Sequence, residues 1–402
     1  MTDTPQRPTE TPTRPRITWD EIARSSALLT FLAILAALVI SAILIVAADP
    51  QVRGSVSYFF DRPGDTLGAA WSAVSGAYTS LFRGAIFDYE ASGARTIRPI
   101  TETMVAATPL LFAALGLGIG FRAGLFNIGA QGQVLMGGAM AAWIGFALEL
   151  PIVLHVIVAL LGAAVVGGLW AAIAGVLKAR TGANEVIVTI MLNWIATWLI
   201  TWLLTTSILA RAPNRPISPE VDPSARLPLM LGSQFRLHWG FVLALLAAVG
   251  VWWLMERSTI GFKFRAVGAN MDAARTAGIN VNLVFVMVMV TAGLLAGLGG
   301  AAQILGADHT LRASSAGSIG FDAITVALLG RNRPAGIVGA SVLFGALRAG
   351  SPLMQIASQT PIDIVLVIQA VIVLFIAAPP LVRTMFHLPG RPGSRRAVEV
   401  VS

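Results

Sequence analysis

The stretch Gly124–Gly138, GLFNIGAQGQVLMGG, places uncharged amides and glycines inside a run that is otherwise apolar enough for lipid. An amide within a bilayer must hydrogen-bond to protein or line water, and glycines beside it permit a bent or broken helix. Asn127 and Gln131 are four residues apart and are expected to share one helical face, with Gln133 close by. Two interpretations follow: a buried helix whose amides bond to neighbouring helices, or a discontinuous segment that lines a solute pathway.

A second stretch, residues 261–280, forms a charged island between two apolar spans and reads GFKFRAVGANMDAARTAGIN. Its alanines predict a short helix with little side-chain bulk, which Gly278 can end. Three basic side chains keep this segment in water, those of Lys263, Arg265 and Arg275. A helix with small side chains could enter a cleft of a partner protein and transmit movement; an ordinary solvated loop is the alternative.

The composition of the chain identifies a polytopic membrane protein. Of its 402 residues, 56% are hydrophobic and only 12% are charged. A soluble domain of this length with that composition would precipitate. The formal net charge of +8 would suggest nucleic acid as the partner of a soluble chain, but the basic residues are scattered through loops and tails. Retention of positive charge at the inner membrane face accounts for them. We therefore expect membrane lipid around the chain and no nucleic-acid partner.

Several kinds of chemistry are excluded by residue types that the chain lacks. It contains no cysteine, which rules out disulfides, cysteine nucleophiles and thiolate metal sites. Its four histidines do not have the spacing of a metal-binding pair. The segment from Gly345 to Ser351 has the glycine spacing of a phosphate-binding loop but not its lysine. We expect no metal site, no cofactor and no nucleotide hydrolysis by this chain alone.

Hydrophobic runs predict an all-α fold with about ten membrane segments. The expected segments are residues 26–48, 100–121, 124–148, 151–177, 183–206, 239–255, 282–303, 317–334, 334–349 and 361–381. The segment 317–334 has only a short, mainly apolar run between Asp322 and Arg331, so we expect a half-helix that turns at Pro334. Residues 65–87 are expected to form an interfacial helix, with an additional span as the alternative.

The two interrupted segments, 124–138 and 317–334, fall one in each half of the chain, which is typical of inverted structural repeats. A second intramembrane amide, Asn193, lies in the segment 183–206. The same segment carries tryptophans at four-residue intervals, Trp194, Trp198 and Trp202. We interpret these tryptophans as a lipid-facing or packing surface rather than as a ligand cage.

The membrane domain is expected over residues 26–385, between a disordered cytoplasmic tail at 1–25 and a second cytoplasmic tail at 386–402. Arginines in both tails favour a cytoplasmic location for the two termini. The expected outer loop, 207–238, carries four basic residues, as many as residues 256–281 on the opposite side. Charge bias therefore orients the chain only weakly, and the orientation depends on the tails.

Three motifs together resemble the nucleoside branch of bacterial ATP-binding-cassette (ABC) permeases, within the larger family that handles branched-chain amino acids and simple sugars. They are Phe126-Asn-Ile-Gly-Ala-Gln-Gly-Gln133, the segment Arg265–Ile279 with its Asp272-Ala-Ala-x-x-x-Gly278 pattern, and Gly320-Phe-Asp-x-Ile-x-Val-Ala-Leu-Leu-Gly-Arg-Asn332. The resemblance covers residues from about 100 to 380. One departure is Gln131, where the branch is expected to carry glutamate, so a charge-dependent step at this position is in doubt.

The resemblance implies a permease subunit in the bacterial plasma membrane that forms the solute pathway of an importer and does not itself catalyse a reaction. Its partners would be an ABC ATPase that binds the ATP, a second and commonly non-identical permease chain, and a substrate-binding lipoprotein or periplasmic protein. The docking loop for the ATPase would be residues 256–281. The residues expected to dock are Arg265, Asn270, Asp272, Ala273, Ala274, Arg275 and Gly278.

Nucleosides carry hydroxyls and a hydrogen-bonding base but no charge, so uncharged amides suit them. The residues expected to line the solute pathway are Asn127, Gln131, Gln133, Asn193 and Asp322. Asp322 has an alternative structural role, in which it pairs with Arg331 or with a helix amino terminus.

Three other functions are alternatives to a nucleoside importer. The same importer class could carry simple sugars. An ion-coupled secondary transporter would also use broken helices, but it calls for carboxylates deep within the spans. A membrane enzyme would need a histidine cluster, paired carboxylates or a nucleophile with its base, and the sequence offers none of these.

Overall fold

The computed structural model describes residues 26–211, 215–358, 361 and 363–386. The tails predicted over 1–25 and 386–402 lie outside these ranges, apart from Phe386. Within them, all regular elements are helices. The elements are α2 (Ser26–Ala48), α3 (Pro50–Val56), α4 (Pro63–Ala85), η1 (Gly93–Thr96), α5 (Arg98–Arg122), α6 (Ala130–Ala147), α7 (Ile152–Thr181), α8 (Glu185–Leu203), α9 (Gly240–Arg257), α10 (Thr259–Ala269), α11 (Met271–Thr276), α12 (Val281–Gln303), the π-helical turn η2 (Ile304–Asp308), α13 (Ile319–Leu329), α14 (Pro334–Ser358), α15 (Asp363–Ala377) and α16 (Pro379–Met385).

Seven helices in the described part of the chain are long and apolar enough to cross a membrane. They are α2, α5, α7, α8, α9, α12 with its π-helical extension, and α14. Two shorter apolar helices, α13 and α15, and the glycine- and amide-bearing α6 complete the set of membrane segments that the sequence predicts. An all-α polytopic membrane fold is therefore confirmed.

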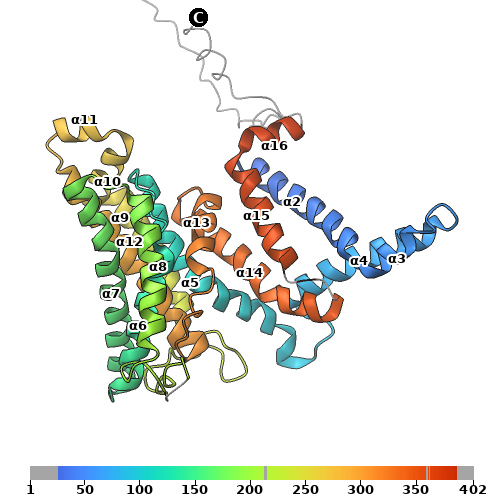
Figure 1. The fold of residues 1–402 in the computed structure, drawn as a ribbon, viewed down its shortest axis with the longest axis horizontal. Helices are drawn as coiled ribbons and strands as arrows, with labels where there is room; N and C mark the ends of the chain where they lie inside the picture. Colours follow the sequence, from blue (N-terminus) through green and yellow to red (C-terminus); the bar gives the residue numbers. More distant parts are fainter. Residues whose placement is uncertain (1–25, 212–214, 359–360, 362, 387–402) are drawn as a thin grey trace, which may run out of the picture.

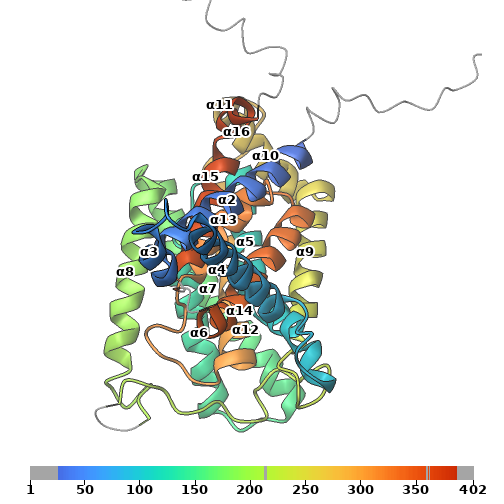
Figure 2. The ribbon, with the colours of Figure 1, turned by 90° about the vertical axis from the view of Figure 1, so that its right-hand side faces the viewer.

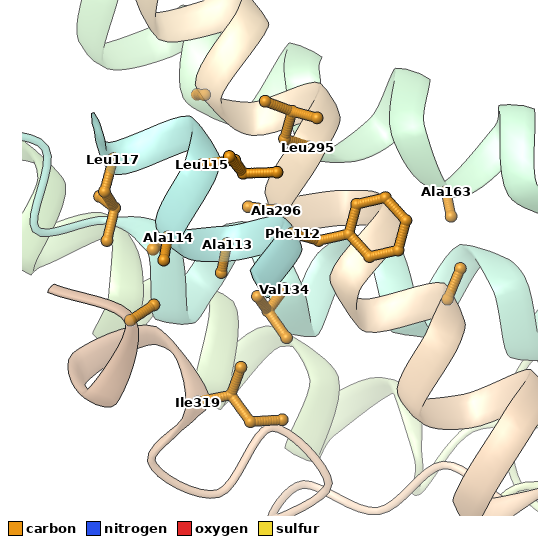
Figure 3. Packing of buried hydrophobic residues seen from close by; sticks show 14 of the residues in the cluster. Phe112, Ala113, Ala114, Leu115, Leu117, Val134, Ala163, Leu295, Ala296 and Ile319 are labelled. Carbon is orange, nitrogen blue, oxygen red and sulfur yellow. The ribbon is translucent and has the colours of Figure 1, made fainter. Parts of the chain in front are cut away.

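Helix α5 lies at the centre of the main bundle. Its membrane-crossing stretch is 83% buried, far more than that of α7 or α8. In Figure 3, Phe112 and Leu115 of α5 lie among Leu295 of α12, Val134 of α6 and Ile319 at the start of α13. Elements from both halves of the chain thus share one apolar core.

Small residues let α12 approach α7 at backbone distance. Gly293 and Gly297, one turn apart on α12, face Ala163 and Gly167 of α7. A Cβ atom added at Gly297 would lie 2.3 Å from the carbonyl oxygen of Ala163, and one at Gly293 would lie 2.4 Å from that of Gly167. This is the small-residue packing by which helices associate in lipid, where burial of apolar surface supplies little driving force.

A second group of helices, α2, α4, α14, α15 and α16, lies beside the main bundle (Figure 1). Helix α14 joins the two groups, because it packs against α5 on one side and α4 on the other. Helix α4 occupies the residues predicted to be interfacial and leaves apolar side chains exposed, among them Leu67, Trp71 and Phe82. Its Tyr78 hydroxyl donates a hydrogen bond to the carbonyl of Leu38 in α2.

The molecule has two distinct ends. We call the end that carries α10 and α11 the α11 end, and the opposite end, where residues 204–211 and 215–239 run, the loop end (Figures 1 and 2). Helix α16 lies at the α11 end, and the start of α2 lies beside it, because Ala33 and Ala36 pack against Phe375 and Val382. At the loop end, backbone hydrogen bonds from Val221 to His309 and from Leu227 to Leu305 tie residues 215–239 to the π-helical turn.

One local prediction is wrong. Within the membrane segment expected over 124–148, helix α6 begins only at Ala130, and Gly124 leaves the end of α5 with a φ of +75°, so the segment is discontinuous. Asn127 therefore does not share a helical face with Gln131. Its side-chain oxygen instead accepts a hydrogen bond from the backbone N–H of Gly129 at 2.9 Å, a local turn that competes with helix formation.

Candidate functional site

The non-helical segment Gly124–Gly129 is stabilised from within by two amides. Asn127 and Gln133 exchange hydrogen bonds: Asn127 Nδ2 donates to Gln133 Oε1 at 3.3 Å, and Gln133 Nε2 donates to Asn127 Oδ1 at 3.2 Å. Both side chains are almost completely buried. Their amide groups are thus used to hold the break between α5 and α6 in shape.

Helix α8 supplies the remaining support for this segment. Asn193 Oδ1 accepts from the N–H of Gly132 at 2.8 Å, and Asn193 Nδ2 donates to the carbonyl of Ile128 at 2.9 Å. The hydroxyl of Thr189, one turn earlier on α8, accepts from the N–H of Ile128 at 3.2 Å. Backbone groups that the broken helix leaves free inside the membrane are satisfied in this way.

Gln131 joins the two interrupted segments. Its Nε2 donates to the carbonyl of Gly317 at 2.6 Å, and its Oε1 accepts from the N–H of Gly320 at 2.8 Å. A Cβ atom at Gly320 would lie 2.2 Å from the backbone nitrogen of Gln131, so only glycine permits this contact. The first turns of α6 and α13 therefore abut, and we call this contact the Gln131 junction.

The two helices run apart from the Gln131 junction in opposite directions. Helix α6 leads to the loop end, where Gly145 lies against Val221, and α13 leads toward Asn332, which lies beside Gly118 near the other end of α5. Their positive amino-terminal ends meet inside the bundle. Such paired helix ends favour electronegative atoms of a passing solute.

Asp322 lies in the first turn of α13 and accepts a hydrogen bond from the hydroxyl of Ser318 at 2.7 Å. This is the placement at a helix amino terminus that the sequence offered as its structural alternative. Of the five residues expected to line the pathway, Asn127, Gln133 and Asn193 hold the loop, Gln131 binds the start of α13 from the first turn of α6, and Asp322 lies in the first turn of α13. The structure brings all five to one region, and their contact with solute stays a prediction.

The short helix α11 has the form that its sequence predicts. Asn270 caps it, accepting from the N–H groups of Asp272 and Ala273 at 2.9 and 3.0 Å. Gly278 ends it with a φ of +79° and donates to the carbonyl of Arg275. In the described chain Ala274 is buried beneath the helix, whereas the side chain of Asp272 is 92% exposed.

Arg265 lies below this helix rather than on its exposed surface. Its guanidinium is 3.7 Å from Glu256 at the end of α9, and Glu256 also accepts from Arg122, the last residue of α5, at 2.7 Å. One carboxylate thus links the ends of α5, α9 and α10. A movement of α10 and α11 has a direct connection to the central helix of the bundle.

Sequence reasoning missed a polar basin at the loop end. Two cavities of about 430 and 310 Å³ adjoin there and share Gln303, Ala307, Asp308 and Arg348. The π-helical turn forms one wall, and Arg236 stabilises it by donating to the carbonyl of Ala307 at 3.0 Å. π-Helical turns interrupt regular backbone bonding and occur frequently at functional sites.

Arg348 is the only charged residue in α14. A lone charge within a membrane helix is costly and indicates function, so this residue was detectable from the sequence.

A buried histidine lies beneath the π-helical turn. His238 accepts from the N–H of Gly240 at 3.2 Å, and its ring packs so closely on Gly306 that no Cβ would fit there. Burial, together with the neighbouring His309 and Arg236, lowers the pKa of His238 to about 4. The imidazole is therefore neutral at physiological pH.

Comparison with known proteins places the chain in a family. Residues 100–377 match the model of the branched-chain amino acid transport system permease component. A guanosine ABC transporter permease of Bacillus subtilis is 38% identical over 320 residues, which cover 79% of this chain and 89% of that protein. A nucleoside ABC transporter permease of Lactococcus lactis is 34% identical over 72% of this chain and 81% of its own length.

A third relative differs in its solute. A glucose ABC transporter permease of Haloferax volcanii is 35% identical, with 69% of this chain and 75% of that protein covered. No solved structure matches the chain. The family match covers more than half of the chain and includes the Gln131 junction, α11 and the polar basin. The chain therefore belongs to the family of branched-chain amino acid transport system permease components.

Proposed function

We propose that this chain is the membrane-spanning permease subunit of an ABC importer for nucleosides. It forms the solute pathway, whereas a separate ATPase subunit binds and hydrolyses ATP. A second, non-identical permease chain completes the pathway, and a lipoprotein or periplasmic receptor delivers the solute. The importer resides in the bacterial inner membrane, with the α11 end and both termini in the cytoplasm.

The observation that carries this proposal is the form of α11. It is a short, capped helix of small residues that projects beyond the membrane helices (Figure 1). Asp272, Ala273, Arg275 and Gly278 are exposed on it, while Ala274 anchors it. A slim, rigid and solvent-exposed helix is suited to a cleft in a partner subunit, and the ion pairs of Glu256 connect the preceding helix, α10, to α5 and α9.

The ion pairs of Glu256 suggest how ATP hydrolysis is coupled to transport. ATP binding closes the ATPase and pulls on α10 and α11, and the pull is transmitted through Glu256 to the ends of α5 and α9. Helix α5 contacts both α6 and α13, so its tilt changes the relation of the two half-helices at the Gln131 junction. The pathway then changes from outward to inward access.

A nucleoside is the proposed solute because the groups around the Gln131 junction are mainly uncharged donors and acceptors, which match a base and a ribose. Two of the relatives named above are permeases for guanosine and for nucleosides. The glucose permease of Haloferax volcanii supports simple sugars as the second candidate. Competition between radiolabelled guanosine and unlabelled glucose in the same uptake assay separates the two.

Replacing Gly278 by proline tests the docking role. Proline fixes φ near −65°, which is incompatible with the φ of +79° at this position, and it removes the N–H that binds the carbonyl of Arg275. We expect uptake and solute-stimulated ATP hydrolysis to be lost in the complete importer while the chain still folds.

Gly182 provides a matched control for this variant. It follows α7 with a φ of +70°, and like Gly278 it has no neighbouring atom near the position of an added Cβ. Its N–H binds the carbonyl of Lys178 in the same manner. Gly182→Pro, expressed at the same level as Gly278→Pro, should retain uptake that is coupled to ATP hydrolysis. Normal uptake by Gly278→Pro, or equal loss in both variants, would contradict the docking role.

A further inference from the structure

The basin at the loop end contains an arginine with no hydrogen-bond or close ion-pair partner among the described residues. The guanidinium of Arg348 lies within a membrane helix and is only partly exposed, and the carboxylates of Asp308 and Asp322 interact with it only through longer-range electrostatic attraction. An arginine at such depth normally pairs with an acid or faces a water-filled cavity. Arg348 lines both adjoining cavities. Its N–H donors are therefore available to a solute in the basin.

The position of Arg348 connects the basin to the Gln131 junction. A Cβ added at Gly317 would lie 3.1 Å from Arg348 Nη2, so the guanidinium rests against the backbone of Gly317. The carbonyl of that same glycine accepts from Gln131. A solute held by Arg348 would thus lie one residue away from the point where α6 and α13 meet.

A hydrogen-bond acceptor, Asp308, lines the same two cavities. Asp308 ends the π-helical turn, and Gln303 Nε2 donates to its Oδ1 at 3.0 Å. This hydrogen bond orients the carboxylate and leaves its other oxygen available. The larger cavity is also lined by the hydroxyls of Thr310, Ser314 and Ser315 and by Arg312, and the smaller one by the ion pair of Glu102 and Arg236.

The charges of the basin favour an uncharged, hydroxyl-bearing solute. Arg348 and Arg312 could bind a phosphate group, but the carboxylate of Asp308 lines the same cavity and repels a dianion. The larger cavity, about 430 Å³, lies within the size range of small-molecule sites. A guanidinium donor and a carboxylate acceptor in one cavity match a molecule that carries both carbonyl acceptors and hydroxyl donors.

We propose that Arg348 and Asp308 are the nucleoside-recognition residues of this chain at the loop end. Arg348 donates to the carbonyl and ring-nitrogen acceptors of the base, and Asp308 accepts hydrogen bonds from the ribose hydroxyls. This inference rests on the proposed function. Because a guanidinium offers donors only, the basin favours a base whose edge carries two acceptors, as in inosine, over adenosine, which presents an amino donor there.

The test uses the complete importer with its receptor and nucleoside at saturating concentrations, so that every receptor is loaded and selection by the receptor does not enter. The measured quantity is the ratio of inosine to adenosine transport rates. For Arg348→Gln we expect this ratio to fall about tenfold, since one bidentate contact to a base edge is worth about 1–3 kcal/mol. Arg95→Gln is the control, because Arg95 is exposed outside the basin and the ratio should not change.

A second variant tests the role of Asp308. Asp308→Asn should slow the transport of inosine but leave that of 2′,3′-dideoxyinosine unchanged, because the dideoxy analogue lacks the hydroxyls that Asp308 binds. An unchanged inosine-to-adenosine ratio in Arg348→Gln would overturn the inference, whether or not the overall rate falls. Faster transport of inosine 5′-monophosphate than of inosine would also overturn it and assign the basin to phosphate. Failure of the unmodified importer to carry any nucleoside would instead refute the proposed function.

Discussion

Replacing Gly297 by alanine is expected to force α7 and α12 apart. The new Cβ would lie 2.3 Å from the carbonyl oxygen of Ala163 and 3.2 Å from the Cα of Gly167. Carbon and oxygen atoms in proteins approach to about 3.3 Å, so the helices must separate by about 1 Å. Both obstacles are backbone atoms of a buried helix, which cannot rotate away as a side chain could.

The steric clash at Gly297 lowers the stability of the fold, whereas the higher helix propensity of alanine raises it. Overpacking a well-packed interior costs about 1–3 kcal/mol, and exchanging glycine for alanine within a helix gains up to about 1 kcal/mol. We expect a net loss of about 1–2 kcal/mol in the free energy of unfolding. Because Gly293 makes a similar approach to Gly167 one turn earlier, separation at Gly297 also weakens that contact.

Gly250 on α9 provides the control. No atom lies within 4 Å of a Cβ added there, so Gly250→Ala obtains the helical gain without the clash. Thermal unfolding in detergent, followed by tryptophan fluorescence, should give a lower midpoint for Gly297→Ala than for the unmodified chain and an equal or higher one for Gly250→Ala. If both variants raise the midpoint, the close contact of α7 and α12 is wrong.

Three further substitutions test the remaining parts of the structure. Gln131→Met keeps the length of the side chain but removes both the donor to the carbonyl of Gly317 and the acceptor for the N–H of Gly320, so uptake should fall; unchanged uptake would contradict the role of these bonds. Glu256→Gln weakens the ion pair with Arg122 and should lower the free energy of unfolding by less than about 1 kcal/mol. In the complete importer this variant should still hydrolyse ATP but take up less solute per ATP. An unchanged ratio of uptake to ATP hydrolysis would show that this carboxylate does not transmit the movement of the ATPase. The pKa of His238 is lowered from 6.5 to about 4 in the folded chain, so its stabilising contribution is complete above pH 6.5 and is lost as the pH falls toward 4. The unfolding midpoint should accordingly drop between pH 7 and 5, and His238→Gln should show a shallower drop; parallel pH profiles would refute this cause.

The membrane helices were largely predictable because lipid leaves the backbone few choices. The apolar run Ser26–Ala48 has the bounds of α2, since an uninterrupted run in the bilayer must bond internally as a helix. The short run in 317–334 gave the half-helix Ile319–Leu329 for the same reason of length. The exposed tryptophans of α8 likewise agree with their interpretation as a lipid-facing or packing surface.

Features that depend on contacts between distant segments of the chain were harder to predict from the sequence. The helical period predicted that Asn127 and Gln131 would share one helical face. Asn127 instead lies in a turn and pairs with Gln133, because its side chain bonds to the nearby backbone and so competes with helix formation. The π-helical turn Ile304–Asp308 has no signal of its own in the sequence and depends on Arg236 and residues 215–239. Arg348, by contrast, stood alone in an apolar helix and could have been identified.

The central claim is that this chain is moved by a separate ATPase rather than by an ion gradient. The most direct test is to reconstitute the purified chain into liposomes and to measure nucleoside accumulation under an imposed proton or sodium gradient, with and without its ATPase, second permease and receptor. We predict accumulation only when the full set of subunits and ATP are present. Accumulation by the chain alone, driven by either gradient, would contradict the account.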